Sequence, residues 1–158
     1  MGKDAKAPAE KIFYTKQFLT LLCIGRRGAF EQGLYDGVAV GKIKHREDID
    51  SLYTATMKPY DLFFEAEPER KIEWLDKRLV FDDPLYNVNY LYAILVTCQL
   101  YQQAHIDPKK FAVNYRNLLE NGYPAPANIL LKKYMGINYD NRTLLSGTLD
   151  LFSAKCKN

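Results

Sequence analysis

The sequence has few histidines, an odd number of cysteines and no motif that would pair either type for chemistry. It contains two histidines, His45 and His105, which lie far apart and outside any H-E-x-x-H or comparable ligand pair. We interpret both as surface residues. The three cysteines, Cys23, Cys98 and Cys156, form no C-x-x-C pair. Cys23 and Cys98 stand among apolar residues and are predicted to be buried thiols.

The chain also lacks features of secreted, membrane and nucleic-acid-binding proteins. Its longest apolar run, LYAILVTC, is far too short for a membrane span, and the polar start MGKDAKAPAEK is not a signal peptide. The absence of a signal peptide and the odd number of cysteines together favour a cytoplasmic location. The net charge of +3, without a run of five basic residues, predicts no nucleic-acid partner.

What the chain does contain is helical spacing of apolar residues along most of its length. No segment shows the sustained alternation of a strand, so we predict an all-α fold of about seven helices. A disordered tail over residues 1–10 would precede a single helical domain over residues 11–158. The expected helices cover residues 11–40, 48–64, 69–78, 84–104, 108–120, 126–134 and 141–155.

Local signals mark several of the expected helix ends. Asp107, followed by proline, is predicted to cap the helix over 108–120, and Gly122 to stop it. Asp82 or Asp83 would cap the helix over 84–104, with Pro84 in its first turn. These two aspartates are also adjacent carboxylates that suit a cation, but capping explains them more simply.

A glycine repeat within the first predicted helix has two interpretations. Gly33, Gly37 and Gly41 recur every four residues. On a helix this spacing leaves bare patches along one face, against which another backbone would pack closely. Alternatively, the glycines belong to turns of a loop.

The most unusual stretch is DDPLYNVNYLYA, because 12 of the 158 residues are tyrosines and three of them fall here. Tyr86 and Tyr90 are i, i+4 and share a helix face, with Asn87 slightly to one side. Buried tyrosine hydroxyls need hydrogen-bond partners. The stretch is therefore either an interhelical face whose hydroxyls bond backbone groups, or a cleft wall that donates hydrogen bonds to a ligand.

Several segments in order resemble the C-terminal portion of the M3 family of zinc metallopeptidases, in particular the oligoendopeptidase F-like branch. DPLYNVNYLYAIL is similar to a family segment rich in tyrosine that ends in Tyr-Ala. NYRNLLENGYPAPANILLKKYMGIN is similar to a segment with glycine, proline and a Leu-Leu-Lys-Lys run before Gly-Ile. The stretch from Phe18 to Phe152 follows the family order, downstream of the zinc-binding motif.

The resemblance implies an all-helical, peptidase-like fold with a cleft that closes over short peptides. It implies that Tyr90 occupies the position of a tyrosine that stabilises the oxyanion, and that Asn87 stands where some members carry another tyrosine. The sequence lacks the H-E-x-x-H motif and the family histidine expected before the tyrosines. The chain is therefore expected to hold no zinc itself and to cleave no peptide alone.

Three functions remain open on this basis. The chain is a peptidase-like domain that binds a peptide or peptide-like ligand through Tyr86, Asn87 and Tyr90 without its own zinc site. Alternatively, it is one subunit of a split metallopeptidase whose zinc is supplied by a partner chain. In the third, it is a structural or adaptor protein that uses the former cleft face as an interface. Under all three a homo- or hetero-oligomer is expected, because a portion of a larger fold exposes apolar surface.

Overall fold

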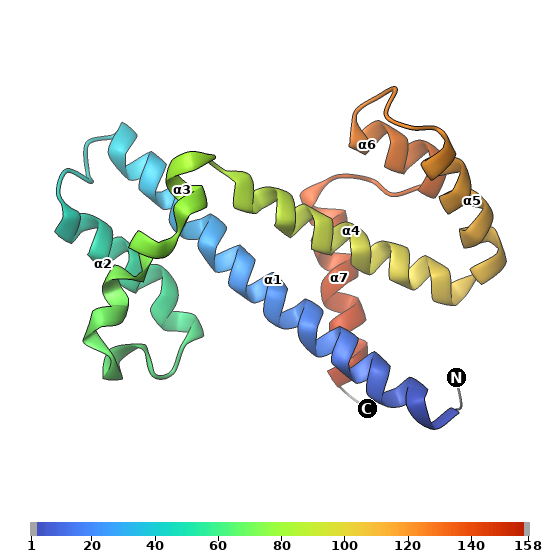
Figure 1. Ribbon diagram of the computed structural model, residues 1–158, viewed down its shortest axis with the longest axis horizontal. Coiled ribbons are helices and arrows are strands. Elements are labelled where there is room, and N and C mark those ends of the chain that lie inside the picture. Colours follow the sequence, from blue (N-terminus) through green and yellow to red (C-terminus); the bar gives the residue numbers. More distant parts are fainter. Residues whose placement is uncertain (1–2, 157–158) are drawn as a thin grey trace. The chain divides into compact units, whose positions relative to one another are not determined.

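The computed structural model describes residues 3–156, and these residues form helices, turns and connecting loops without a strand. The predicted all-α fold is confirmed (Figure 1). Contacts divide the chain into two compact units, and the prediction of a single domain over residues 11–158 stays a prediction. The central unit contains Lys16–Leu91, and the terminal unit contains the described residues from 3 to 15 and from 92 to 156.

The central unit consists of long and short helical elements in sequence order. They are the C-terminal part of α1 (Lys3–Ala39), α2 (Arg46–Met57), the 3₁₀ elements η1 (Lys58–Tyr60), η2 (Phe64–Ala66) and η3 (Pro68–Asp76), the short α3 (Arg78–Asp82), and the first turns of α4 (Tyr86–Ile106). Within this unit, α2 and the 3₁₀ elements lie beside the end of α1 (Figure 1).

Two predicted helices of the central unit are shorter or wound differently than expected. The helix predicted over 48–64 ends at Met57 and continues only as a 3₁₀ turn, because Pro59 lacks the backbone N–H that an α-helix requires. The segment predicted as a helix over 69–78 instead winds as successive 3₁₀ turns over Pro68–Asp76. α1 starts at Lys3, within the tail that was predicted to be disordered.

The core of the central unit is aromatic and joins α1, α2 and the 3₁₀ segment. Phe30 meets Tyr53 edge-on, with ring centroids 5.0 Å apart. The Trp74 indole N–H donates to Asp50 at 2.7 Å, so the ring is buried without an unpaired donor. The buried core residues are Phe30, Leu34, Tyr53, Met57, Phe64, Trp74 and Val80. Burying each large side chain contributes roughly 1.5–3 kcal/mol before entropy is counted.

The glycine repeat is divided between the end of α1 and the turn that follows it. Gly33 and Gly37 lie inside α1, and a Cβ at Gly37 would come within 2.6 Å of Ile43 Cδ1. A Cβ at Gly33 would lie 3.2 Å from Leu52 Cδ1. The expectation that another backbone packs against them is wrong, because side chains fill the space. Gly41 follows the helix with a φ of 69°, a left-handed conformation that glycine adopts without strain.

The terminal unit contains the start of α1, most of α4 and the remaining helices. These are α5 (Pro108–Glu120), α6 (Ala127–Leu130), the π-helical turn η4 (Leu131–Met135) and α7 (Asn141–Cys156). The Asp107 side chain accepts from the Lys110 N–H at 3.0 Å, which confirms the predicted cap. Gly122, with a φ of 66°, ends α5 as predicted.

The interior of the terminal unit brings α1, α4 and α7 together. The Phe13 and Tyr101 rings stack with centroids 4.2 Å apart, and Tyr14 meets Phe152 edge-on at 6.3 Å. Cys98 is fully buried, as predicted, and burial raises the pKa of its thiol. Cys23, in the central unit, is only partly buried, so the prediction that its thiol is buried is wrong.

None of the helices within residues 3–156 combines the length and the apolarity that crossing a bilayer requires.

Candidate functional site

The two tyrosines singled out from the sequence lie together on the surface of the central unit. Their ring centroids are 5.3 Å apart in an edge-to-face arrangement, and Tyr86 and Tyr90 are 36% and 45% exposed. A hydrogen bond between them raises the pKa of Tyr90 above its ordinary value. Both rings are therefore accessible, and neither is a buried part of an interhelical face.

Asn87 points to a different part of the unit. Its side chain is buried, and Nδ2 donates to Oε2 of Glu31 at 3.1 Å. The three predicted site residues therefore do not form one surface. Tyr86 and Tyr90 face outward, whereas Asn87 joins an internal polar cluster around Glu31.

Glu31 is a carboxylate with 0% exposure on α1. Oε1 accepts from the backbone N–H of Leu85, and Oε2 accepts from Asn87. The Tyr35 hydroxyl donates to the Val80 carbonyl oxygen at 2.6 Å and lies 3.3 Å from Oε1. Burial and the nearby carboxylate raise the pKa of Tyr35. Among the described residues no Lys or Arg forms an ion pair with Glu31, so hydrogen bonds alone offset its desolvation.

This cluster replaces the cap that was predicted for α4. The helix begins at Tyr86 rather than at Pro84, after Leu85 has adopted a φ of 64°, which is rare for a residue other than glycine. Asp82 forms an ion pair with Arg78 at 2.8 Å. The Asp83 backbone carbonyl, and not its side chain, accepts from the Tyr86 N–H. Glu31, from a distant part of the chain, therefore supplies the carboxylate at this turn.

A cavity of 280 Å³ lies next to this cluster, within the central unit. Phe30, Tyr53, Met57 and Val80 give it a buried apolar floor, and Asn87 belongs to its wall. Pockets for small-molecule ligands usually measure about 300–1,000 Å³. A volume just below that range suits one or two amino-acid side chains rather than a large cofactor.

The rim of the cavity is mainly cationic. Arg27, Lys77 and Arg78 line it together with a single acid, Asp76. Arg78 is already paired with Asp82, whereas neither Arg27 nor Lys77 forms an ion pair with another residue in the described part of the chain. An apolar floor below two unpaired cations favours a ligand that has both an apolar group and a carboxylate.

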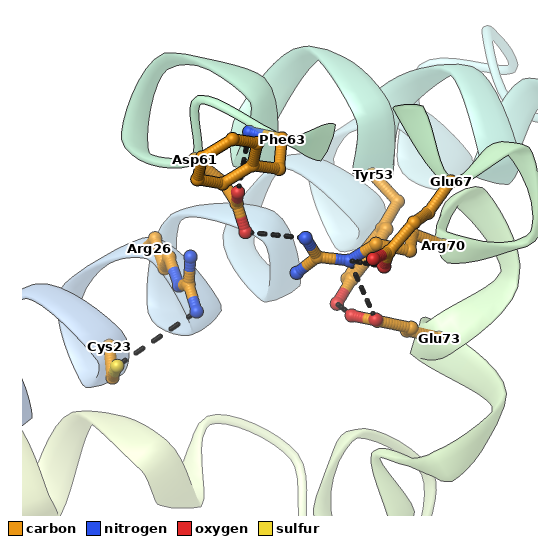
Figure 2. Close-up of polar contacts among 8 residues, drawn as sticks. All are labelled: Cys23, Arg26, Tyr53, Asp61, Phe63, Glu67, Arg70 and Glu73. Carbon is orange, nitrogen blue, oxygen red and sulfur yellow. Dashed lines mark hydrogen bonds and ion pairs between the residues drawn. The ribbon is translucent and has the colours of Figure 1, made fainter. Parts of the chain in front are cut away.

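A second polar network includes Tyr53 of the cavity floor (Figure 2). Arg70 contacts Asp61 at 2.6 Å, Glu73 at 3.0 Å and Glu67 at 3.7 Å. The Tyr53 hydroxyl donates to Glu73 at 3.2 Å. Burial, followed by the charge of Glu73, raises the pKa of Tyr53 to about 12.

Arg70 also links the network to the core, because its guanidinium lies 5.2 Å from the centroid of the Phe64 ring. The Phe63 backbone N–H and then Arg70 lower the pKa of Asp61. Figure 2 shows Arg26 and Cys23 on the neighbouring α1, where Arg26 Nη2 lies 3.9 Å from the sulfur. The contacts of Arg70, and not that within α1, fix the 3₁₀ segment in place.

Neither histidine lines the cavity. The backbone N–H of His45 donates to Asp48 at the start of α2, and His105 Nδ1 lies 2.9 Å from the Tyr101 carbonyl oxygen. Both side chains are exposed, as the sequence predicted. No three His, Cys, Asp or Glu residues within the described chain come close enough together to hold a metal ion.

Comparisons with models of protein families, with curated proteins and with solved structures found no match for this chain.

Sequence reasoning missed Glu31 and the cationic rim. A signal for Glu31 is present, because Arg27, Phe30, Glu31 and Leu34 have the i, i+3, i+4, i+7 spacing of one helix face. A carboxylate between buried Phe30 and Leu34 is unusual enough to mark a polar cluster. Its partner Asn87 lies far along the sequence, and no local pattern connects the two.

Proposed function

We propose that this chain is a helical peptide-binding protein that uses the cavity of its central unit and performs no hydrolysis on its own. The observation that carries the proposal is the cavity itself, which combines a buried apolar floor with the unpaired cations Arg27 and Lys77. A peptide would place an apolar side chain on the floor and a carboxylate against the rim.

The role agrees with the resemblance to the C-terminal portion of M3 peptidases, which implies a peptide cleft. The proposed contacts differ, however, from those that the sequence predicted. Asn87 would contribute through the cavity wall, and Tyr86 and Tyr90 would contact ligand residues that extend beyond the rim. Since the amide of Asn87 already donates to Glu31, its oxygen is the group left to accept from a peptide N–H.

The test is binding of short, fluorescently labelled peptides, measured by anisotropy. Peptides that combine Leu or Phe with an acidic residue or a free C-terminus should bind more tightly than their amidated or lysine-containing counterparts. Arg27→Gln and Lys77→Gln should each weaken binding about fivefold to tenfold, which corresponds to roughly 1–1.4 kcal/mol. Lys42→Gln, an exposed lysine of the same unit outside the cavity, serves as the matched control. Equal binding to all three variants, or no preference for acidic peptides, would refute the proposal.

The exposure of Tyr90 favours one second candidate, a subunit of a split M3-type metallopeptidase in which another chain holds the zinc. The tagged chain would be purified from its native cells, and the isolated complex tested for zinc and for oligopeptide cleavage. Cleavage that is lost in Tyr90→Phe but kept in Tyr60→Phe, another exposed tyrosine, would support this candidate. A complex without zinc or cleavage would leave the adaptor role.

A further inference from the structure

A second surface of the chain, in the terminal unit, has the properties of an interface without a partner in this chain. We refer to residues 107–136, which contain α5, α6 and η4, as the α5–α6 hairpin. Along α5 the apolar residues Phe111, Tyr115, Leu118 and Leu119 recur at helical spacing. Yet α5 contains no buried residue, and Leu119 is 64% exposed. An amphipathic helix normally buries its apolar stripe, whereas this stripe is only partly covered within the described chain.

The partly covered stripe forms one wall of an apolar groove of 280 Å³. Tyr115, Leu118 and Leu119 line it from α5, Leu100 from α4, and Leu131 from η4. Tyr123, which is 99% exposed, stands at its edge. A groove between helices that is lined by leucine and tyrosine matches the way proteins bind the apolar face of another helix.

Hydrogen bonds hold the groove open before any partner arrives. The Tyr134 hydroxyl donates to Asn121 Oδ1 at 2.5 Å and thereby ties η4 to the end of α5. Gln103 Nε2 donates to the Met135 carbonyl oxygen at 3.0 Å and ties η4 to α4. A preformed groove loses little conformational entropy when a partner binds.

The charge of the hairpin identifies the kind of partner. Residues 107–136 hold five of the 22 Lys and Arg residues but only two of the 19 Asp and Glu residues, so the entire net charge of +3 belongs to this segment. Arg116, Lys132 and Lys133 are all exposed. A second copy of the chain would bring the same positive surface to the interface, and like charges would repel.

We propose that the α5–α6 hairpin docks an acidic amphipathic helix of a partner protein. The apolar face of that helix lies in the groove between α5 and η4, and its acidic residues face Arg116, Lys132 and Lys133. This surface is separate from the peptide cavity of the central unit, and the proposal does not depend on it.

The experiment uses the full chain and a designed peptide of about 18 residues, with Leu at helical i, i+3, i+4 and i+7 positions and Glu elsewhere. Two matched peptides carry Lys in place of every Glu, or the same residues in scrambled order. Anisotropy of the labelled peptides should show saturable binding of the acidic amphipathic peptide. The lysine and scrambled peptides should bind at least tenfold more weakly, and added salt should weaken the acidic peptide further.

Variants of the chain locate the binding. Leu119→Asp should weaken the acidic peptide at least tenfold, and so should Lys132→Glu combined with Lys133→Glu. Val113→Asp is the matched control, because Val113 is a similarly exposed apolar residue of α5 outside the groove, and it should bind like the unaltered chain. Two exposed sites are tested, so a folding defect in one variant does not decide the result.

Three outcomes would overturn the proposal. One is equal binding of the acidic and lysine peptides, and another is a loss in Val113→Asp as large as in Leu119→Asp. The third comes from sedimentation of the chain alone. A dimer that dissociates in Leu119→Asp would show that a second copy, and not an acidic partner, covers the groove.

Discussion

The buried carboxylate of Glu31 gives the sharpest test of how the central unit is held together. We consider Glu31→Ala, which removes the acceptor of two hydrogen bonds, one from the Leu85 N–H and one from Asn87 Nδ2. Asn87 is buried except where it lines the cavity, so only water within the cavity could replace the acceptor that its amide loses. Leu85 lies in a turn and its side chain is exposed, so water can partly replace the hydrogen bond that its backbone N–H loses.

The magnitude follows from these two bonds. A hydrogen bond to a charged group contributes about 1.5–3 kcal/mol, and a buried donor left unpaired costs about 1–3 kcal/mol. We therefore expect Glu31→Ala to lower the free energy of unfolding of the central unit by about 3–5 kcal/mol. Glu31→Gln should cost less, about 1–2 kcal/mol, because its oxygen still accepts from Leu85 and the Asn87 side chain can turn its own oxygen toward the new amide.

The assay is urea unfolding followed by tryptophan fluorescence. Trp74 is the single tryptophan of the chain and is buried in the central unit, so its emission reports that unit alone. Gln32→Ala, at an exposed neighbouring position of α1, is the control and should change stability by no more than about 0.5 kcal/mol. A double-mutant cycle of Glu31→Ala with Asn87→Ala should give a coupling energy of about 1–3 kcal/mol.

Two results would refute the reasoning. A loss of less than about 1 kcal/mol in Glu31→Ala would mean that water already reaches the carboxylate and its partners. A coupling energy near zero would mean that Glu31 and Asn87 contribute separately. The polar cluster would then not be what fixes the start of α4.

Three further predictions concern other residues of the central unit. Gly37→Ala should be less stable than Gly25→Ala, by roughly 1–3 kcal/mol in urea titrations. Both gain helix propensity, but the new Cβ at Gly37 would press on the Ile43 side chain, whereas nothing lies within 4 Å of the new Cβ at Gly25. Tyr90→Phe should leave the thermal unfolding temperature almost unchanged, since the residue is exposed; a large drop would mean that its hydroxyl is structural. Stability should fall between about pH 10 and 12, because the pKa of Tyr53 is near 10 in the unfolded chain and about 12 in the folded chain, so the native state binds more protons in that window. Tyr53→Phe should reduce this fall in stability, and an unchanged pH dependence in the variant would contradict the prediction.

Sequence reasoning worked best where a helix end is determined by neighbouring residues. The bounds of α5 were predicted to the residue, because Asp107, the proline after it and Gly122 act locally on the backbone. The same reasoning failed for the segment after Pro68. Its winding is set by distant partners, since Arg70 reaches Asp61 and Trp74 reaches Asp50, and tertiary contacts of this kind override local propensity.

The candidate site was predictable only in part. The i, i+4 spacing of Tyr86 and Tyr90 correctly placed the two rings side by side on one face. The inward direction of the Asn87 side chain was not predictable, because it depends on its hydrogen bond to Glu31, a buried residue of α1. The cationic rim was missed because Arg27 and Lys77 come from distant segments that only the folded chain brings together.

Two separate polar clusters hold different parts of the cavity, one its wall and the other its floor. Asn87 belongs to the wall and to the Glu31 cluster, whereas Tyr53 belongs to the floor and, through Glu73, to the Arg70 network. Apolar contacts alone would let such a small cavity collapse, since close-packed interiors tolerate few voids. Directional bonds to fixed partners keep the wall and the floor in place without a ligand. A ligand that enters would therefore meet a floor and a wall that are already ordered, and the entropy cost of ordering would fall mainly on the rim cations.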